Sequence, residues 1–175
     1  AHTGEAPETI RKRLFDSGYS QSCDSGRLKG EAAYREGVRM LGHRITLDRF
    51  RDLWVSAFSP DEEVIGLARA AKDRSAVALI TNNSALVREG LELIHPQAME
   101  AFRPQLFSAD LGIMKPDPRI FAAMADLLGI EPGEALFVDD AAKHVAGAAS
   151  MGFAVHHFRS APMLELELRK LELLA

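Results

Sequence analysis

The sequence has one cysteine, few aromatic residues and no excess of positive charge. Cys23 is the only cysteine among 175 residues, so neither a disulfide within the chain nor a zinc cluster built from cysteines can form. We therefore expect a cytoplasmic protein. The formal net charge of -4 at pH 7 and the lack of a basic run argue against nucleic acid or an anionic membrane as a partner. The expected partners are small molecules or another protein.

Long apolar runs are also missing. No apolar stretch reaches the roughly 20 residues of a membrane-spanning helix, and the start, AHTGEAPETIRKR, lacks the apolar core of a signal peptide. We therefore expect no membrane partner. Apolar residues make up 47% of the sequence, which at this length suffices for one compact domain carrying a small subdomain.

The first third of the chain has a helical pattern. Between residues 7 and 58, apolar side chains recur at three-and-four spacing, as at Phe50, Leu53 and Trp54. This pattern predicts a helical cap subdomain over residues 1–58. At SPDEE the pattern changes, and we expect Ser59 to cap a helix that runs to about Arg74.

Strand and helix patterns alternate over the rest of the chain. The runs AVALITN, QLFSA, ALFVDD and FAVHHF predict strands, whereas SALVREGLELI, DPRIFAAMADLLG, AAKHVAGAASMG and PMLELELRKLELL predict helices. These strands are too apolar for one face of the sheet to be exposed to solvent. Burial of both faces is typical of a parallel sheet covered by helices. We therefore predict an α/β fold over residues 59–175, a Rossmann-like parallel sheet with helices on both faces.

Polar residues follow these strands at the carboxyl ends, where such sheets bind ligands. Thr81 and Asn82 end the first strand, and their side chains, with the N–H groups that open the next helix, suit an anion. A turn with a helix cap explains the same residues equally well. Lys115 precedes Pro-Asp-Pro, so prolines stiffen it on the helix side. Most lone lysines are merely solvated, but a rigid one near a strand end suits phosphate or a carboxylate.

Asp139 and Asp140 form an acidic pair at the end of ALFVDD. Adjacent carboxylates repel each other and are costly to bury unless a cation meets them. One of them can cap the following helix. With no arginine nearby in sequence, the pair favours a hard cation such as Mg2+, which prefers oxygen ligands.

In this order, LITNNS, KPDPRIF and FVDD resemble the haloacid dehalogenase superfamily of hydrolases. The resemblance covers the chain from about Ser59 onward, and the helical stretch before it is similar to the small cap that some members carry. It implies that Thr81 and Asn82 bind the transferred group. It also implies that Lys115 ties that group to the nucleophile, and that Asp139 and Asp140 hold Mg2+ directly or through water.

One element of the family pattern is missing. Family members begin with an apolar strand ending in Asp-x-Asp, whose first Asp is the nucleophile and whose second is the general acid and base. The nearest string here, RLFDSG, does not match, because Asp16 follows a charged helical stretch and Gly18 stands two residues later. In the family this strand lies between those bearing LITN and FVDD. We expect an upstream segment of a longer protein to carry it, since neighbours of an absent central strand would expose unpaired backbone groups.

A smaller departure concerns the residue four positions after Asp140. Related sequences often carry Asn or Asp there, to orient the metal or the lysine, whereas this chain has His144. A histidine can hydrogen-bond in the same place. We expect, however, only a partly buried helix residue.

The predicted activity is that of a phosphatase. A phosphate ester brings negative charge to a carboxylate nucleophile, and a divalent cation is the usual means of neutralising it. We expect Mg2+-dependent hydrolysis of a small phosphate ester through an aspartyl-phosphate on the missing nucleophile, and no activity without that segment. The alternatives are a metal-independent 2-haloacid dehalogenase and a catalytically silent binding module of the same fold. Receiver domains of response regulators use the same residue types at the ends of parallel strands. Their acid pair comes first in the chain, whereas here it comes after Thr81 and Lys115, which argues against that class.

Overall fold

The computed structural model describes residues 6–174 and divides into two compact units. The helical unit contains Ala1–Ser59, Asn82–Ile94 and Phe107–Ile113, and the sheet unit contains Pro60–Thr81, His95–Leu106 and Met114–Ala175. Residues 1–5 of the predicted cap and residue 175 of the predicted core lie outside the described residues. The assignment of residues 1–58 as cap and 59–175 as core stays a prediction.

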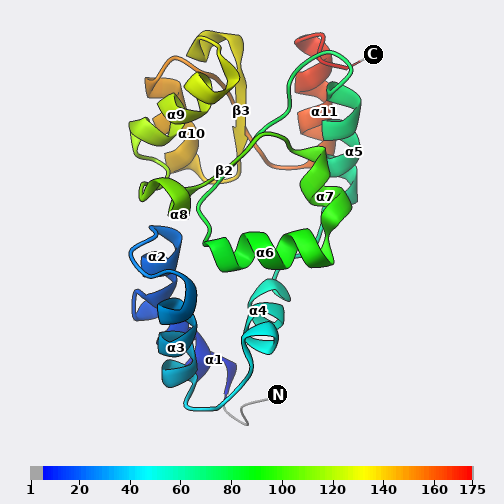
Figure 1. Cartoon of the computed structure of the whole chain (residues 1–175). Helices are drawn as coiled ribbons and strands as arrows, with labels where there is room; N and C mark the ends of the chain where they lie inside the picture. The colour runs from blue at the N-terminus through cyan, green and yellow to red at the C-terminus, as the bar shows by residue number, and fades with distance from the viewer. Residues whose placement is uncertain (1–5, 175) are drawn as a thin grey trace. The chain divides into compact units, whose positions relative to one another are not determined.

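The helical unit is built from helices of three chain segments (Figure 1). They are α1 (Pro7–Arg11), the π-helix η1 (Lys12–Asp16), α2 (Tyr19–Asp24), α3 (Gly30–Leu41), α4 (Leu47–Val55), α6 (Ala85–Ile94) and α8 (Ser108–Leu111). Local sequence sets the boundaries. Thr46 caps α4, because its Oγ1 accepts the N–H of Arg49 at 3.2 Å. Gly42 ends α3 with a φ of 71°, which glycine adopts without strain.

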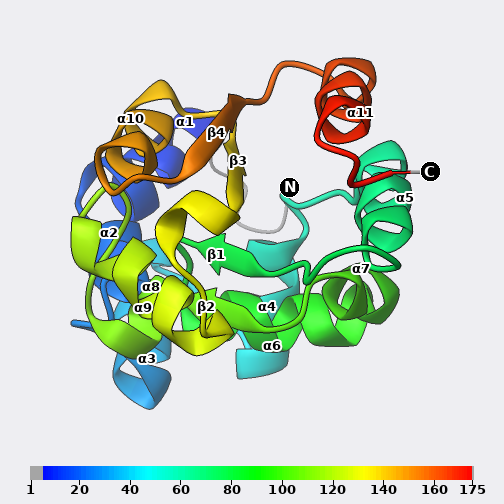
Figure 2. The ribbon, with the colours of Figure 1, turned by 90° about the horizontal axis from the view of Figure 1, so that it is seen from above.

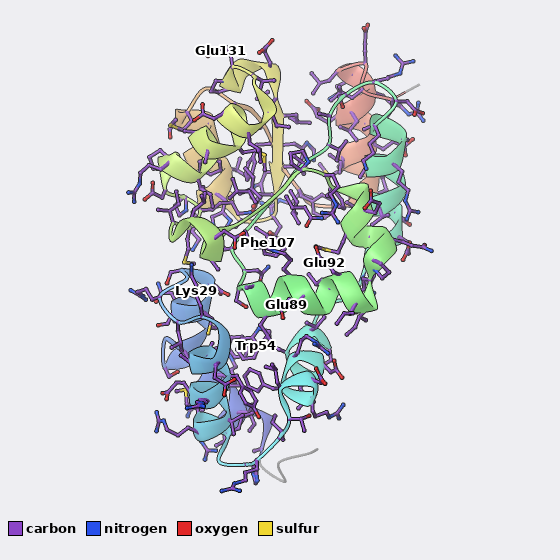
Figure 3. The ribbon with its side chains drawn as sticks, in the orientation of Figure 1. Lys29, Trp54, Glu89, Glu92, Phe107 and Glu131 are labelled. Carbon is purple, nitrogen blue, oxygen red and sulfur yellow. The ribbon has the colours of Figure 1, made fainter. Side chains whose placement is uncertain are left out.

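Aromatic side chains form the centre of the helical unit. Trp54 is labelled in Figure 3. Its ring stacks on Phe15 at a centroid distance of 5.4 Å and lies 5.8 Å from the ring of Phe50. A Cβ on Gly37 would lie 2.4 Å from Cζ of Phe50 and 2.6 Å from the hydroxyl of Tyr19. Glycine at this position therefore lets α3 pack directly against the aromatic cluster.

The sheet unit alternates helices and strands. Its elements are α5 (Glu62–Ala71), β1 (Leu79–Thr81), α7 (Pro96–Ala101), β2 (Gln105–Phe107), α9 (Pro118–Leu128), the 3-10 helix η2 (Pro132–Glu134), β3 (Leu136–Asp139), α10 (Ala142–Ser150), β4 (Ala154–His157) and α11 (Ala161–Lys170). Strand β3 runs parallel to β4, with Leu136 opposite Ala154 and Asp139 opposite His157 (Figure 2). The predicted α/β fold with parallel strands is confirmed.

Helices cover both faces of the β3–β4 pair. Along a strand, successive side chains point to opposite faces. Leu136 and Val138 pack against the cluster that α5 and α11 form, which includes Leu164. Phe137, between them, is buried and meets the ring of Phe121 on α9 at 5.2 Å. The core of the sheet unit therefore has two layers of helices, as the strand composition predicted.

Some local expectations were wrong. Asp61, not Ser59, caps α5, because its carboxylate accepts the N–H of Val64 at 3.1 Å, and the helix ends at Ala71 rather than near Arg74. A carboxylate also favours the positive end of the helix, so Asp61 is the better cap. Helices α7 and α8 were not predicted. Among residues 6–174, no helix is long and apolar enough to cross a membrane.

The strands are less buried than their composition led us to expect. All three residues of β1 are half-buried, as are Leu136 and Val138 of β3. The physical reason lies in the pairing of the described strands: β1 pairs only with β2, and β3 only with β4. Each pair is therefore a two-stranded sheet in which both strands are edge strands. An edge strand keeps part of its surface exposed.

Candidate functional site

Lys115 connects the ends of two strands in the sheet unit. Its Nζ lies 2.6 Å from Oδ2 of Asp139, at the end of β3, and donates to the backbone carbonyl of Ile80 in β1 at 2.9 Å. Only 9% of the Lys115 side chain and 7% of the Asp139 side chain are exposed. The ammonium also lies 5.5 Å from the ring centre of Phe137. The carboxylate and the carbonyl offset the cost of burying this ammonium group.

The residues after Lys115 hold it in place. Asp117 caps α9, because its Oδ1 accepts the N–H of Arg119 at 3.0 Å, and Gly129 ends that helix in a left-handed conformation. These were the predicted ends of the helix. A Cβ on Gly147 of α10 would lie 2.9 Å from Cβ of Pro116. The close approach of α10 that this glycine allows fixes the backbone next to the lysine.

Asp139 accepts hydrogen bonds on both carboxylate oxygens. Oδ2 faces Lys115, while Oδ1 accepts the N–H of Ala141 at 2.9 Å and lies 3.0 Å from Nδ1 of His144. Burial alone would raise the pKa of Asp139. The hydrogen bonds from Lys115 and Ala141 and the charge of Lys115 outweigh it, so the pKa lies below its usual value. Asp139 is therefore a carboxylate at neutral pH.

Asp140 differs from its neighbour because its side chain is exposed. Its backbone carbonyl accepts a hydrogen bond from Nε2 of His157 at 2.9 Å. Nδ1 of the same ring lies 3.3 Å from Nη2 of Arg159 and can accept from it, which fits the tautomer with hydrogen on Nε2. The parallel register brings His157 to this end of the sheet. The result is a fixed backbone that presents an exposed carboxylate to solvent.

The donor set fits a hydrated Mg2+ ion better than an enclosed metal. Among residues 6–174, no group of three or more His, Cys, Asp or Glu side chains is arranged to hold a metal. The oxygens of Asp139 already accept three hydrogen bonds, which leaves the exposed carboxylate of Asp140 as the available ligand. Mg2+ keeps several waters and is commonly held by one or two carboxylates together with substrate phosphates. The exposed carboxylate of Asp140, completed by water and a substrate phosphate, therefore suits a site of this kind.

The predicted phosphate-binding residues follow β1. Thr81 ends the strand, directly after the carbonyl that binds Lys115. Thr81, Lys115, Asp139 and Asp140 all belong to the sheet unit, whereas Asn82 begins the next segment of the helical unit. Lys115 and Asp139 are in direct contact. The roles of these residues in binding and catalysis stay predictions.

Two histidines have contacts that the sequence did not reveal. His144 was expected to be a partly buried helix residue, and it is, but it also contacts Asp139. Its place in the first turn of α10, just after the acid pair, was the available signal. His157 became recognisable only through the register of β4. Asp16, the nearest match to a nucleophile, is exposed and ends the π-helix η1, so it does not lie at the end of a strand.

Comparison with known sequences identifies relatives. Residues 17–152 match the model of the haloacid dehalogenase-like hydrolases. The chain is 34% identical over 91 residues to a phosphatase of Mycobacterium tuberculosis, an alignment that covers 51% of this chain and 42% of the relative. It is 30% identical over 107 residues to (S)-2-haloacid dehalogenase 1 of a Pseudomonas species, covering 61% and 45%. The aligned part thus spans less than half the length of these two curated relatives.

Solved structures agree on the fold. A protein of Porphyromonas gingivalis, described as a predicted haloacid dehalogenase-like hydrolase, has a TM-score of 0.72 and 22% identity, with 94% of this chain and 91% of that chain covered. An enzyme of Bacteroides thetaiotaomicron from the same family, solved with magnesium and inorganic phosphate, has a TM-score of 0.73 and 18% identity, covering 87% and 84%. Since the family model matches most of its length, the chain belongs to the haloacid dehalogenase-like hydrolases.

Proposed function

We propose that the protein is a phosphatase that hydrolyses a small phosphate ester with the help of Mg2+. One observation carries the proposal: the buried Lys115–Asp139 pair lies at the strand end where Asp140 presents an exposed carboxylate. A fixed cation and an accessible oxygen ligand at one strand end suit a dianionic group better than a neutral one. The similarity to a mycobacterial phosphatase supports the same conclusion.

Each residue has a distinct role in this proposal. Lys115 orients the transferred phosphoryl group, and Asp139 pairs with the ammonium and holds it in place. Thr81 and Asn82 bind phosphate oxygens through their side chains. Asp140 would hold Mg2+, which when bound neutralises part of the phosphate charge.

The nucleophile in this proposal lies on a strand outside the 175 residues, inserted between β1 and β3. Three observations support its position: the described strands form two separate pairs, their apolar side chains are half-buried, and Lys115 bonds to both β1 and β3. An Asp on that strand would attack phosphorus and form an aspartyl-phosphate, with release of the alcohol. Water, activated by a second carboxylate, would then hydrolyse the acyl phosphate to inorganic phosphate. The 175-residue chain alone would show no turnover.

A panel of phosphate esters and 2-haloacids, offered to the full-length protein with and without Mg2+, tests the proposal. We expect phosphate release that requires Mg2+ and is lost in Lys115→Ala. Asp140→Asn should lose both the rate and its response to Mg2+. Asp73→Asn, at an exposed carboxylate of the sheet unit, is the matched control and should keep full activity. Halide release without Mg2+ would establish a dehalogenase instead. Steady phosphate release by the 175-residue chain, sensitive to Lys115→Ala, would contradict the proposed nucleophile.

A further inference from the structure

Three segments of the helical unit meet around Ser108, the first residue of α8. Its neighbour Phe107 is labelled in Figure 3. Ser108 is fully buried. Its Oγ lies 2.5 Å from the backbone carbonyl of Asp24, at the end of α2, and 3.5 Å from the backbone carbonyl of Asn83. The N–H of Ala109 also donates to Asn83, at 3.4 Å. The backbone carbonyl of Asn83, the residue after Asn82, is therefore held by the first two residues of α8.

Asp24 makes a second connection to the same segment. Its carboxylate accepts a hydrogen bond from the backbone N–H of Ser84. Ser84 itself is buried, and its Oγ accepts the N–H of Val87 at 3.3 Å, as a helix cap does. From the sequence, the N–H groups at the start of α6 were expected to suit an anion. The backbone N–H of Ser84 instead donates to the carboxylate of Asp24.

The turn after α2 is fitted to this position. Gly26 has a φ of 67°, and a Cβ there would lie 2.3 Å from the backbone oxygen of Ala109. A side chain at this position would push the turn, and Asp24 with it, away from α8. The contact therefore depends on close backbone packing and is not an incidental surface bond.

We propose that Asp24 and Ser108 clamp residues 82–84 and thereby position Asn82 for a phosphate oxygen. The inference rests on the proposed function, in which Asn82 binds the transferred group. Asp24 is a positioning residue, because it acts on the backbone of Ser84 and not on the phosphate. An ionised carboxylate would repel phosphate, so its useful property is to accept a hydrogen bond, which an amide oxygen also does.

Amide hydrogen exchange of the 15N-labelled full-length protein tests the clamp itself. Asp24→Ala should speed exchange at Ser84 about fivefold, the effect of one lost hydrogen bond, and Asp24→Asn should change it less than about twofold. Asp61→Ala is the matched control, since it removes a similar cap from α5 and should affect Val64 but not residues 82–84. If Asp24→Ala fails to fold, Ser108→Ala decides, with faster exchange at Ala109. Unchanged exchange in the folded Asp24 and Ser108 variants overturns the clamp.

Inorganic phosphate, titrated with Mg2+ while the Asn82 amide signal is followed, tests what the clamp does. Asp24→Asn should bind phosphate at least as tightly as the wild type, because it keeps the acceptor and removes a charge that repels phosphate. Asp24→Ala should bind about fivefold more weakly than the wild type, because the loosened segment must be ordered on binding. Phosphate affinity that is lost in Asp24→Ala but kept in Asp24→Asn would show that Asp24 acts as a hydrogen-bond acceptor and not through its charge. Equal affinity in Asp24→Ala overturns the positioning role alone. No phosphate response in the wild type overturns the proposed function and the role of Asn82 together.

Discussion

Nδ1 of His144 lies 3.0 Å from Oδ1 of Asp139, on the carboxylate whose other oxygen faces Lys115. Only 13% of the His144 side chain is exposed. Its Nε2 is buried and has no hydrogen-bond partner among the described residues. The histidine thus stabilises the site through one nitrogen and leaves the other unsatisfied, at a cost comparable to the gain.

Replacing His144 should separate these two effects. His144→Ala loses the bond to Asp139 and leaves a cavity, so we expect a loss of about 1–2 kcal/mol in the free energy of unfolding. The amide nitrogen of Asn lies about where Nδ1 lies, so His144→Asn keeps the bond and removes the unsatisfied nitrogen. We expect its stability to equal or exceed that of the wild type in urea unfolding. His43→Ala, at an exposed histidine, is the control, and equal losses in both His144 variants would contradict this account.

Lys115→Met should be strongly destabilising. It keeps the length of the side chain but leaves the buried carboxylate of Asp139 without its cation, which costs about 3 kcal/mol in comparable buried pairs. The pKa of Asp139 is lowered in the folded state, so this stabilisation is present above the usual carboxyl pKa and is lost as the pH falls below it. The difference between variant and wild type should therefore shrink in acid.

Two further variants make the Lys115 prediction specific. Lys115→Met/Asp139→Asn should recover much of the loss, because no charge remains buried. Lys170→Met removes a largely exposed lysine paired with Glu167 at 3.2 Å, and should cost less than about 0.5 kcal/mol. Equal effects of the two lysine substitutions in urea unfolding would show that the Lys115 pair does not stabilise the fold.

Much of the fold was predictable because its signals are local. Both ends of α9 follow from Asp117 and Gly129, and β3 and β4 lie within the predicted strand runs ALFVDD and FAVHHF. The contact between Lys115 and Asp139 agrees with the expectation that polar residues near the carboxyl ends of parallel strands gather at one edge of a sheet. Such reasoning needs only the order of elements.

The remaining features depend on contacts between distant residues. His157 meets the Asp140 backbone only because β4 pairs with β3 in one particular register. Asp24 meets Ser84 through packing within the helical unit, 60 positions along the chain, and no spacing in the sequence marks that pair. The cap at Asp61 was missed for a different reason, since Ser59 and Asp61 both have capping side chains and geometry chose between them.

Asp24 should make stability fall as the pH rises. Burial raises its pKa from the ordinary 3.8 to about 6, although the hydrogen bond from Ser84 opposes the shift. Between about pH 4 and pH 6 the folded state therefore binds more protons than the unfolded state, and stability decreases through this window. Asp24→Asn keeps the acceptor and removes the charge. We expect it to be about 1 kcal/mol more stable at neutral pH, after allowance for solvent screening, and equal to the wild type below about pH 4.

Urea unfolding between pH 3.5 and pH 7.5 would check the Asp24 prediction, with Asp61→Asn as the control at an exposed helix cap. The control should show no gain at neutral pH. Parallel pH profiles for Asp24→Asn and the wild type would mean that the Asp24 carboxyl titrates as it does in the unfolded chain.

Two glycines in helices should respond in opposite ways to alanine. In Gly37→Ala the new Cβ would lie 2.4 Å from Phe50, so α3 must move away from the aromatic cluster, at a cost of about 2 kcal/mol. Gly66, in α5, has open space where a Cβ would lie, with nothing within 4 Å, so Gly66→Ala should gain about 0.5–1 kcal/mol from helix propensity. Thermal unfolding distinguishes the two, and a stabilised Gly37→Ala would contradict the packing of α3.

Mg2+ should stabilise the 175-residue chain weakly and through Asp140. A single exposed carboxylate beside an already hydrogen-bonded one gives few protein ligands, so we expect a Kd on the order of millimolar or weaker. At about ten times the Kd, binding to the folded state alone adds roughly 1.4 kcal/mol of stability. The measurement is the shift in Tm between MgCl2 and NaCl at equal ionic strength, reversed by EDTA.

The variant Asp140→Asn should abolish the shift in Tm. Without Mg2+ this variant should be at least as stable as the wild type, because the repulsion from Asp139 is gone. Asp73→Asn should keep the shift, since its exposed carboxylate follows α5 and is not part of the acid pair. An undiminished Mg2+ response in Asp140→Asn would place the ion elsewhere and remove the main support for a metal at the end of β3.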